Sequence, residues 1–201
     1  MTALGPRYWI LVLARAVPAA IIAIFITFSA DHSVRLGALS LGIFAVITAG
    51  LLIPTALREL TGSSRLLVLV QGIVLAVGAV LAFLGLGASV SYLLSVTSAI
   101  FVVSGALELA AGLLARGQHG VARDWIFLGG LSVLFGLAVL LIPVDLVDVI
   151  TIPDQTVAPL TAPTVVVGGL GAYTAIAAVY LVIAALSLKW AAQPSAPIKE
   201  A

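Results

Sequence analysis

Three polar side chains interrupt apolar stretches of this sequence, and they are the residues whose types could do chemistry. Arg15, Gln71 and Glu108 each lie within a long run of aliphatic and small residues. If the runs are helices, Arg15 is eight residues beyond Arg7, a depth of about 12 Å at about 1.5 Å per residue. Glu108 lies eight residues before Arg116, again about 12 Å deep, and Gln71 is about 9 Å deep. The sequence thus predicts a polar cluster to which three helices contribute at nearly one level.

The remaining residues show no pattern typical of other chemistry. Cysteine is absent, and the two histidines, His32 and His119, stand alone in the sequence. A metal site needs several ligands close together, and a hydrolytic site needs a nucleophile beside a base. We therefore expect a protein that is not an enzyme, with no cofactor and no metal ion. The formal net charge is only +1 and the basic residues occur singly, which argues against nucleic-acid binding.

The apolar runs that surround the polar residues are long enough to cross a membrane. Hydrophobic residues make up 63% of the chain and charged residues 8%, whereas soluble domains carry about 25% charged residues. About 20 apolar residues cross a bilayer as a helix, which satisfies its own backbone hydrogen bonds. The sequence therefore predicts an all-α membrane protein in which residues 1–201 form one domain of six transmembrane helices. The expected spans are Tyr8–Ser29, Leu36–Ile53, Leu66–Gly87, Tyr92–Ala115, Trp125–Ile142 and Thr164–Leu188.

A charge inside the bilayer needs an explanation, because placing one at mid-membrane costs about 2.5–3.5 kcal/mol on insertion scales. The simplest interpretation is a structural ion pair between Arg15 and Glu108, capped by Gln71, that fixes how the first and fourth helices meet. Ser104 lies one turn before Glu108 on the same helix face and would belong to this intramembrane polar cluster. Two alternatives stay open. Glu108 could take up a proton in mild acid and loosen the bundle, or Arg15 could reach toward the lipid headgroups and leave Glu108 protonated or hydrated.

The distribution of lysine and arginine predicts one orientation in the membrane. Seven of the nine precede the first span, follow the last, or lie in the second and fourth connections, which share one side of a six-span protein. Arg35 alone lies on the opposite side, so the positive-inside rule places both chain ends, with a tail at 190–201, in the cytoplasm. Trp9, Trp125 and Trp190 lie at the same side. We expect them to anchor the helices at the membrane surface, where indole rings accumulate.

A spacing of 58 residues recurs along the chain. Arg7, Arg65 and Arg123 are separated by this spacing, and so are Arg58 and Arg116. Small residues recur at fixed depth within the spans and predict close helix packing. The sequence therefore predicts three pseudo-repeated helical hairpins, at about 7–58, 65–116 and 123–189.

The third hairpin contains a longer connection than the other two. Residues 144–163 join its helices, whereas helices in a bundle are usually joined by about two to eight residues. The predicted topology places this connection on the outer side. It combines prolines and short apolar runs with Asp145, Asp148 and Asp154. We expect it to lie on the membrane surface or to contact a protein partner.

Two neighbouring stretches of the sequence are similar to a known family. SGALELAAGLLARG at 104–117 precedes WIFLGGLSVLFGLAVLLIP at 125–143. Together they resemble the HdeD family of acid-resistance membrane proteins, which have six helices in three hairpins and the same order of tryptophan, small residues and proline. The best match covers about 91–143, the first hairpin fits more loosely, and 144–163 departs from the family. The resemblance implies a multi-pass protein of the bacterial inner membrane, linked to stress or acid tolerance. It brings no catalytic residues.

The sequence leaves two functional hypotheses. The first is a non-enzymatic HdeD-like membrane protein that acts in stress or acid tolerance or as an accessory subunit of a membrane complex. Its expected partners are the lipid bilayer and either another membrane protein or a second copy of the chain. The alternative is a small transporter or channel that uses Arg15, Gln71 and Glu108, because charges near the membrane midplane are typical of transporters.

Overall fold

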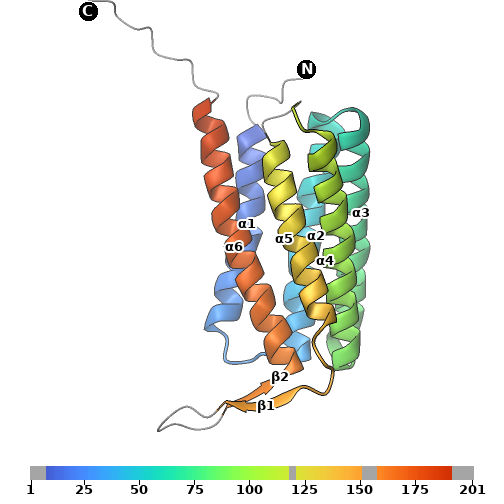
Figure 1. Cartoon of the computed structure of the whole chain (residues 1–201), viewed down its shortest axis with the longest axis vertical. Helices are drawn as coiled ribbons and strands as arrows, with labels where there is room; N and C mark the ends of the chain where they lie inside the picture. Colours follow the sequence, from blue (N-terminus) through green and yellow to red (C-terminus); the bar gives the residue numbers. More distant parts are fainter. Residues whose placement is uncertain (1–7, 118–120, 151–157, 192–201) are drawn as a thin grey trace, which may run out of the picture.

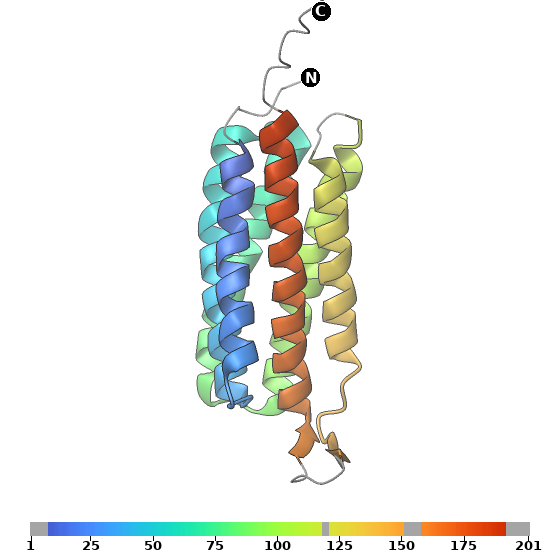
Figure 2. The ribbon, with the colours of Figure 1, turned by 90° about the vertical axis from the view of Figure 1, so that its left-hand side faces the viewer.

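Apolar runs rich in leucine, valine, isoleucine and alanine form the helices, because a helix satisfies its own backbone hydrogen bonds without water. The computed structural model describes residues 8–117, 121–150 and 158–191, and in it six long helices stand side by side and alternate in direction (Figures 1 and 2). All six are long and apolar enough to cross a membrane, so the predicted all-α, six-helix membrane fold is confirmed. The helices are α1 (Tyr8–Phe28), α2 (Val34–Glu59), α3 (Gly62–Leu84), α4 (Val90–Leu114), α5 (Ala122–Leu140) and α6 (Ala162–Ala191), with a 3-10 turn, η1 (Gly85–Gly87), after α3.

Polar and glycine residues mark several helix ends. Ser33 and Ser89 cap α2 and α4, because each side chain accepts a hydrogen bond from the backbone N–H three residues later, at 3.3 and 3.4 Å. In the turns that follow these helices, Gly62, the first residue of α3, and Gly117 have φ angles of +60° and +75°. Glycine adopts this left-handed conformation without a steric penalty, so the chain can reverse within a few residues.

A proline lies inside α2 instead of ending it. The predicted second span stops at Ile53, but α2 continues through Pro54 to Glu59. Pro54 removes one backbone donor, and in the same turn the Thr55 hydroxyl donates to the carbonyl oxygen four residues earlier, at 2.7 Å. Local hydrogen bonding by a hydroxyl makes proline tolerable in a membrane helix. The helix therefore extends six residues beyond the predicted span.

Most of the described basic residues lie at one end of the bundle, here called the basic end, where α1 begins and α6 ends (Figure 1). Arg35 lies in the first turn of α2, at the other end. Arg7 and Lys199 lie outside the described residues. The described lysine and arginine residues outside the bundle interior are thus distributed between the two ends as the sequence predicts. Those at the basic end are Arg58, Arg65, Arg116, Arg123 and Lys189.

The helices pack in a ring that follows the 58-residue repeat. The closest pairs are α2 with α3, α4 with α5, and α6 with α1. Each pair joins the second helix of one predicted hairpin to the first helix of the next, and α6 closes the ring against α1. Helices α2, α4 and α6 also contact one another at the centre, and their most apolar segments are 50%, 44% and 50% buried, against 39%, 39% and 33% for α1, α3 and α5.

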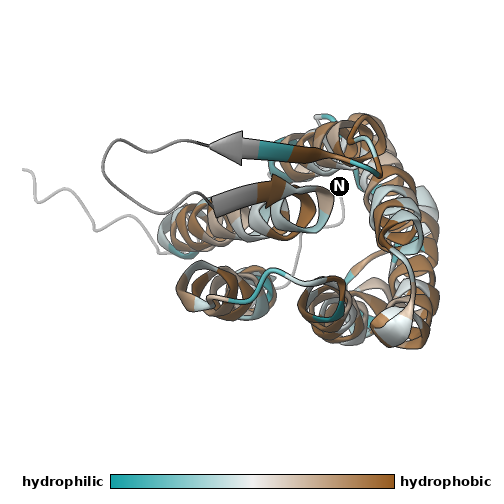
Figure 3. Ribbon diagram, turned by 90° about the horizontal axis from the view of Figure 1, so that it is seen from below, coloured by the Kyte–Doolittle hydropathy of each residue, from teal (hydrophilic) through white to brown (hydrophobic). Residues whose placement is uncertain are grey.

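The outer faces of the helices are hydrophobic, as a surface in contact with lipid requires. Seen along the axis, apolar residues cover much of the ring (Figure 3). Large aliphatic side chains such as Ile24, Val80 and Leu134 are 59%, 58% and 67% exposed. In water such exposure would be costly, but the same groups are at no disadvantage among lipid chains.

Glycines allow the backbones of α4 and α5 to approach each other. A Cβ atom placed on Gly129 would lie 2.4 Å from the backbone nitrogen of Leu109. One placed on Gly105 would lie 2.8 Å from the backbone nitrogen of Val133. Close backbone approach supplies the van der Waals contact that holds helices together in lipid, where the hydrophobic effect does not. The close packing expected from small residues is thus present between these two helices.

Residues 144–163, expected only as a connection, contain a β-hairpin. Strand β1 (Val147–Ile150) pairs antiparallel with β2 (Ala158–Thr161), and Val147 lies opposite Thr161. The hairpin projects beyond the helix ends (Figure 1). In strands of four residues, the alternation of apolar and polar side chains is too short to be recognised in the sequence.

Two of the three aspartates expected in this connection can be placed. The side chains of Asp145 and Asp148 are exposed, whereas Asp154 lies outside the described residues.

Candidate functional site

The predicted pairing of Arg15 with Glu108 is present in the structure. The Arg15 Nη2 atom lies 2.8 Å from Glu108 Oε1, and Gln71 Nε2 donates a hydrogen bond to Glu108 Oε2 at 3.1 Å. Both carboxylate oxygens therefore have a donor, one of them charged. Glu108 and Gln71 are only 4% and 3% exposed. The pair neutralises two charges that would be costly to leave alone in an apolar interior.

The fold explains how three helices reach one carboxylate. Glu108 is on α4, one of the central helices, while Arg15 and Gln71 come from α1 and α3 of the outer set. The long arginine side chain spans the distance from α1 to α4, a pair of helices that are not neighbours in the ring. Ser104 lies one turn from Glu108 on the same face of α4 and is buried. The cluster therefore links α1, α3 and α4 at one level.

A small cavity adjoins the cluster. Its volume is about 20 Å³, room for roughly one water molecule. Arg15, Gln71 and Glu108 line it together with Thr55 and Tyr8. The Nε atom of Arg15 is buried and has no hydrogen-bond partner among the described residues. A space of this size can hold a bridging water but no organic solute.

The cavity lining includes residues that the sequence reasoning missed. Tyr8 lies seven residues before Arg15 on α1, hence on the same face, and this spacing was a usable signal. Thr55 lies on α2, beyond the predicted end of the second span at Ile53. Its place beside the cluster depends on the packing of α2, which no local pattern encodes.

The three tryptophans have different environments. Trp190 is 63% exposed near the end of α6, and Lys189 Nζ lies 5.0 Å from the centre of the partly buried Trp9 ring. Trp125 is only 4% exposed and lines the cavity, so the expectation that it anchors the protein at the membrane surface is wrong. It lies four residues before Gly129, on the face of α5 that packs against α4. Helix packing therefore turns this indole inward.

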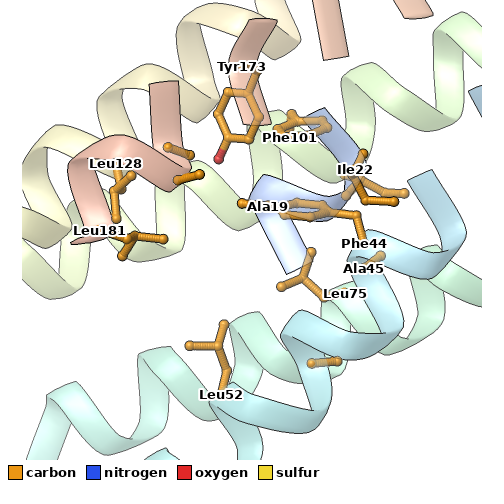
Figure 4. Close-up of a cluster of buried hydrophobic side chains, with 14 of the residues drawn as sticks. Ala19, Ile22, Phe44, Ala45, Leu52, Leu75, Phe101, Leu128, Tyr173 and Leu181 are labelled. Atoms are coloured by element: carbon orange, nitrogen blue, oxygen red, sulfur yellow. The ribbon is translucent and has the colours of Figure 1, made fainter. Parts of the chain in front are cut away.

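An aromatic layer fills the bundle beyond the polar cluster. Phe44, Phe101, Phe135 and Tyr173 stack or meet edge to face, with ring centres 4.7 to 6.3 Å apart. Figure 4 shows three of them, Phe44, Phe101 and Tyr173. The Tyr173 hydroxyl is 2.8 Å from the hydroxyl of Ser132. On α4 this layer lies seven residues from the cluster, about 10 Å toward the hairpin end. Along α4 this layer therefore lies between the cavity and that end of the bundle.

Comparisons with protein-family models, with curated proteins and with solved structures found no match to this chain. The resemblance to the HdeD family therefore stays a prediction. Among residues 8–117, 121–150 and 158–191, no three or more histidine, aspartate or glutamate side chains gather in a group that could hold a metal ion. The polar cluster with its small cavity is thus the candidate site in the interior of the bundle.

Proposed function

We propose that this protein is a non-enzymatic, HdeD-like inner-membrane protein that supports stress or acid tolerance as an accessory subunit of a membrane complex. The observation that carries the accessory role is the β-hairpin, which leaves the bundle and presents exposed groups. Asp145 and Asp148 are exposed there, and Val147 is 71% exposed. Val147 lies on a paired strand and has an acidic residue on each side of it in the sequence. A protein partner can bind such a surface through apolar and charged contacts.

The interior of the bundle supports an accessory role over transport. The charges of Arg15 and Glu108 satisfy each other at 2.8 Å, and the adjoining cavity has a volume of only about 20 Å³. The aromatic layer around Tyr173 lies between this cavity and the hairpin end. A transporter needs a site that holds its solute and opens to each side in turn. The cluster serves instead to fix three helices relative to one another.

The hairpin supplies the first test. Replacing residues 145–161 with a four-residue turn should abolish co-purification of partner proteins in mild detergent, measured by quantitative mass spectrometry. Helix content and melting temperature should stay close to those of the wild type, because the hairpin lies outside the bundle. In cells that lack the native gene, the shortened protein should also fail to restore survival after an acid challenge. An unchanged set of co-purified proteins would remove the hairpin from the proposal.

The proposed orientation places the basic end and both chain ends in the cytoplasm. Reporter fusions at Lys199 and within 117–120 should therefore both read cytoplasmic, and a fusion at Asp154 should read periplasmic. The expectation follows from the basic residues at one end and Arg35 alone at the other. A periplasmic reading at Lys199 would contradict the orientation.

Flux measurements distinguish the accessory role from the alternative. Proteoliposomes that contain the purified protein should release protons, potassium or chloride no faster than empty liposomes. A flux that depends on protein and disappears in Glu108→Gln would favour the transporter hypothesis and overturn the proposal.

A further inference from the structure

The helices α5 and α6 leave a groove between them at the basic end. They follow each other in the ring but pack least closely of all neighbouring pairs (Figure 2). In the half nearer the hairpin the two helices meet, because Phe135 stacks on Tyr173 with ring centres 5.4 Å apart and also contacts Gly169. Toward the basic end, two open hollows of about 420 and 460 Å³ lie along the seam.

One side chain bridges this groove. The Tyr180 ring stacks on Phe127 with ring centres 4.1 Å apart, and its hydroxyl donates to Asp124 Oδ1 at 2.9 Å. The two hollows share Tyr180 and Ile183, so they adjoin at this bridge and together mark the groove. Its α6 side extends from Ala175 to Ala191, about 24 Å at the helical rise. Half of a bilayer's hydrocarbon core is about 15 Å thick, so the groove spans one leaflet and reaches the headgroups.

The polarity of the groove changes along its length. The deep hollow is lined by aliphatic and aromatic residues, among them Ile176 and Val179. The hollow at the basic end adds Arg123, Asp124 and Ser187. An apolar channel with a charged mouth at the membrane surface matches an amphiphile, with its chain inside and its headgroup outside.

The charge at the mouth indicates the headgroup. Arg123 is exposed in the first turn of α5, where the positive end of the helix dipole adds to its charge. Asp124, the next residue, carries the opposite charge, and the hydrogen bond that its Oδ1 accepts from Tyr180 holds this carboxylate toward α6. Trp190 is exposed near the end of α6, seven residues beyond Ile183 and on the same face of the helix, at a level where indole side chains favour the membrane surface.

We propose that the α5–α6 groove is a binding site for an anionic phospholipid, with one acyl chain along Ile176, Val179 and Ile183 and the phosphate at Arg123. A lipid phosphate would place a negative charge beside the Arg123 guanidinium. An apolar helix of a second protein in the same groove would not. On the orientation proposed above, the mouth faces the cytoplasmic leaflet, which carries anionic lipids. The binding itself does not depend on that orientation.

Native mass spectrometry of the detergent-purified protein tests the site by titration with phosphatidylglycerol and with phosphatidylcholine. The wild type should retain phosphatidylglycerol at lower lipid concentration. Arg123→Gln should weaken the binding of phosphatidylglycerol about fivefold, so that the affinities for the two lipids become similar. Arg58→Gln, at another exposed arginine of the basic end, is the matched control and should leave the preference unchanged.

A second pair of variants tests the acyl-chain part. Ile183→Trp should fill the groove and weaken binding of both lipids, whereas Val80→Trp on α3 should not. The two wild-type side chains are both 58% exposed, so the controls are matched in lipid contact. The proposal would be overturned if Arg123→Gln and Arg58→Gln changed the lipid preference equally. It would also be overturned if the Ile183→Trp variant bound both lipids as well as the wild type does. A wild-type dimer that Ile183→Trp dissociates would also overturn it, because the groove would then hold a second copy.

Discussion

Replacing Glu108 with leucine should lower the free energy of unfolding in detergent by about 3–5 kcal/mol. The substitution removes the counter-charge of Arg15, which lies 2.8 Å away in the structure. A guanidinium cannot lose its proton in a protein, so its charge would remain unpaired among apolar helices. Arg15→Leu should also destabilise the protein, because it leaves Glu108 Oε1 without its charged donor. Reversible unfolding in detergent–denaturant mixtures, followed by circular dichroism, measures both losses.

The double substitution separates an ion pair from two independent contributions. Arg15→Leu with Glu108→Leu should recover much of the stability, because replacing a buried ion pair with apolar residues is often nearly neutral. We expect the coupling between the two sites to be at least about 1 kcal/mol. Gln71→Leu serves as a control, since it leaves Glu108 Oε2 without its 3.1 Å donor but keeps the ion pair, and should cost about 1–3 kcal/mol. Losses that simply add would show that the pair does not act as a unit.

Adding one methyl group at Gly129 should destabilise the bundle by about 1–3 kcal/mol. A Cβ atom at this position would lie 2.4 Å from the backbone nitrogen of Leu109 and 2.8 Å from the carbonyl oxygen of Gly105. Backbone atoms cannot move aside as a flexible side chain can, so Gly129→Ala must push α5 away from α4. The same unfolding measurement applies.

The adjacent glycine provides a matched control. A Cβ atom at Gly130 would meet no other atom within 4 Å, although the residue lies in the same helix. Gly130→Ala should therefore be neutral or stabilise the protein by up to about 1 kcal/mol, through the higher helix propensity of alanine. Equal stability of the two variants would mean that α4 and α5 are not in the close contact described here.

Much of the fold follows from the sequence because the membrane imposes strict local rules. Each span must satisfy its backbone hydrogen bonds within itself, so hydropathy and length are enough to find all six helices. The same rules gave the depth of Arg15 and Glu108, since the helical rise converts sequence distance into depth. Two charges at one depth in an apolar medium have few stable arrangements other than contact. The pairing could therefore be predicted from the sequence without knowing how the helices are arranged.

Only the tertiary structure decided how each helix is rotated about its own axis, and therefore which of its side chains face the interior. Depth depends on position along one helix, but the direction in which Trp125 points depends on which neighbour α5 packs against, and that neighbour is α4. The closure of α6 on α1 and the groove beside Tyr180 arise in the same way, from contacts between helices distant in the sequence. The β-hairpin arises from pairing of strands that are each too short to specify themselves. Local sequence fixes what each segment can be, whereas packing among distant segments fixes which of its faces meets a neighbour, a cavity or lipid.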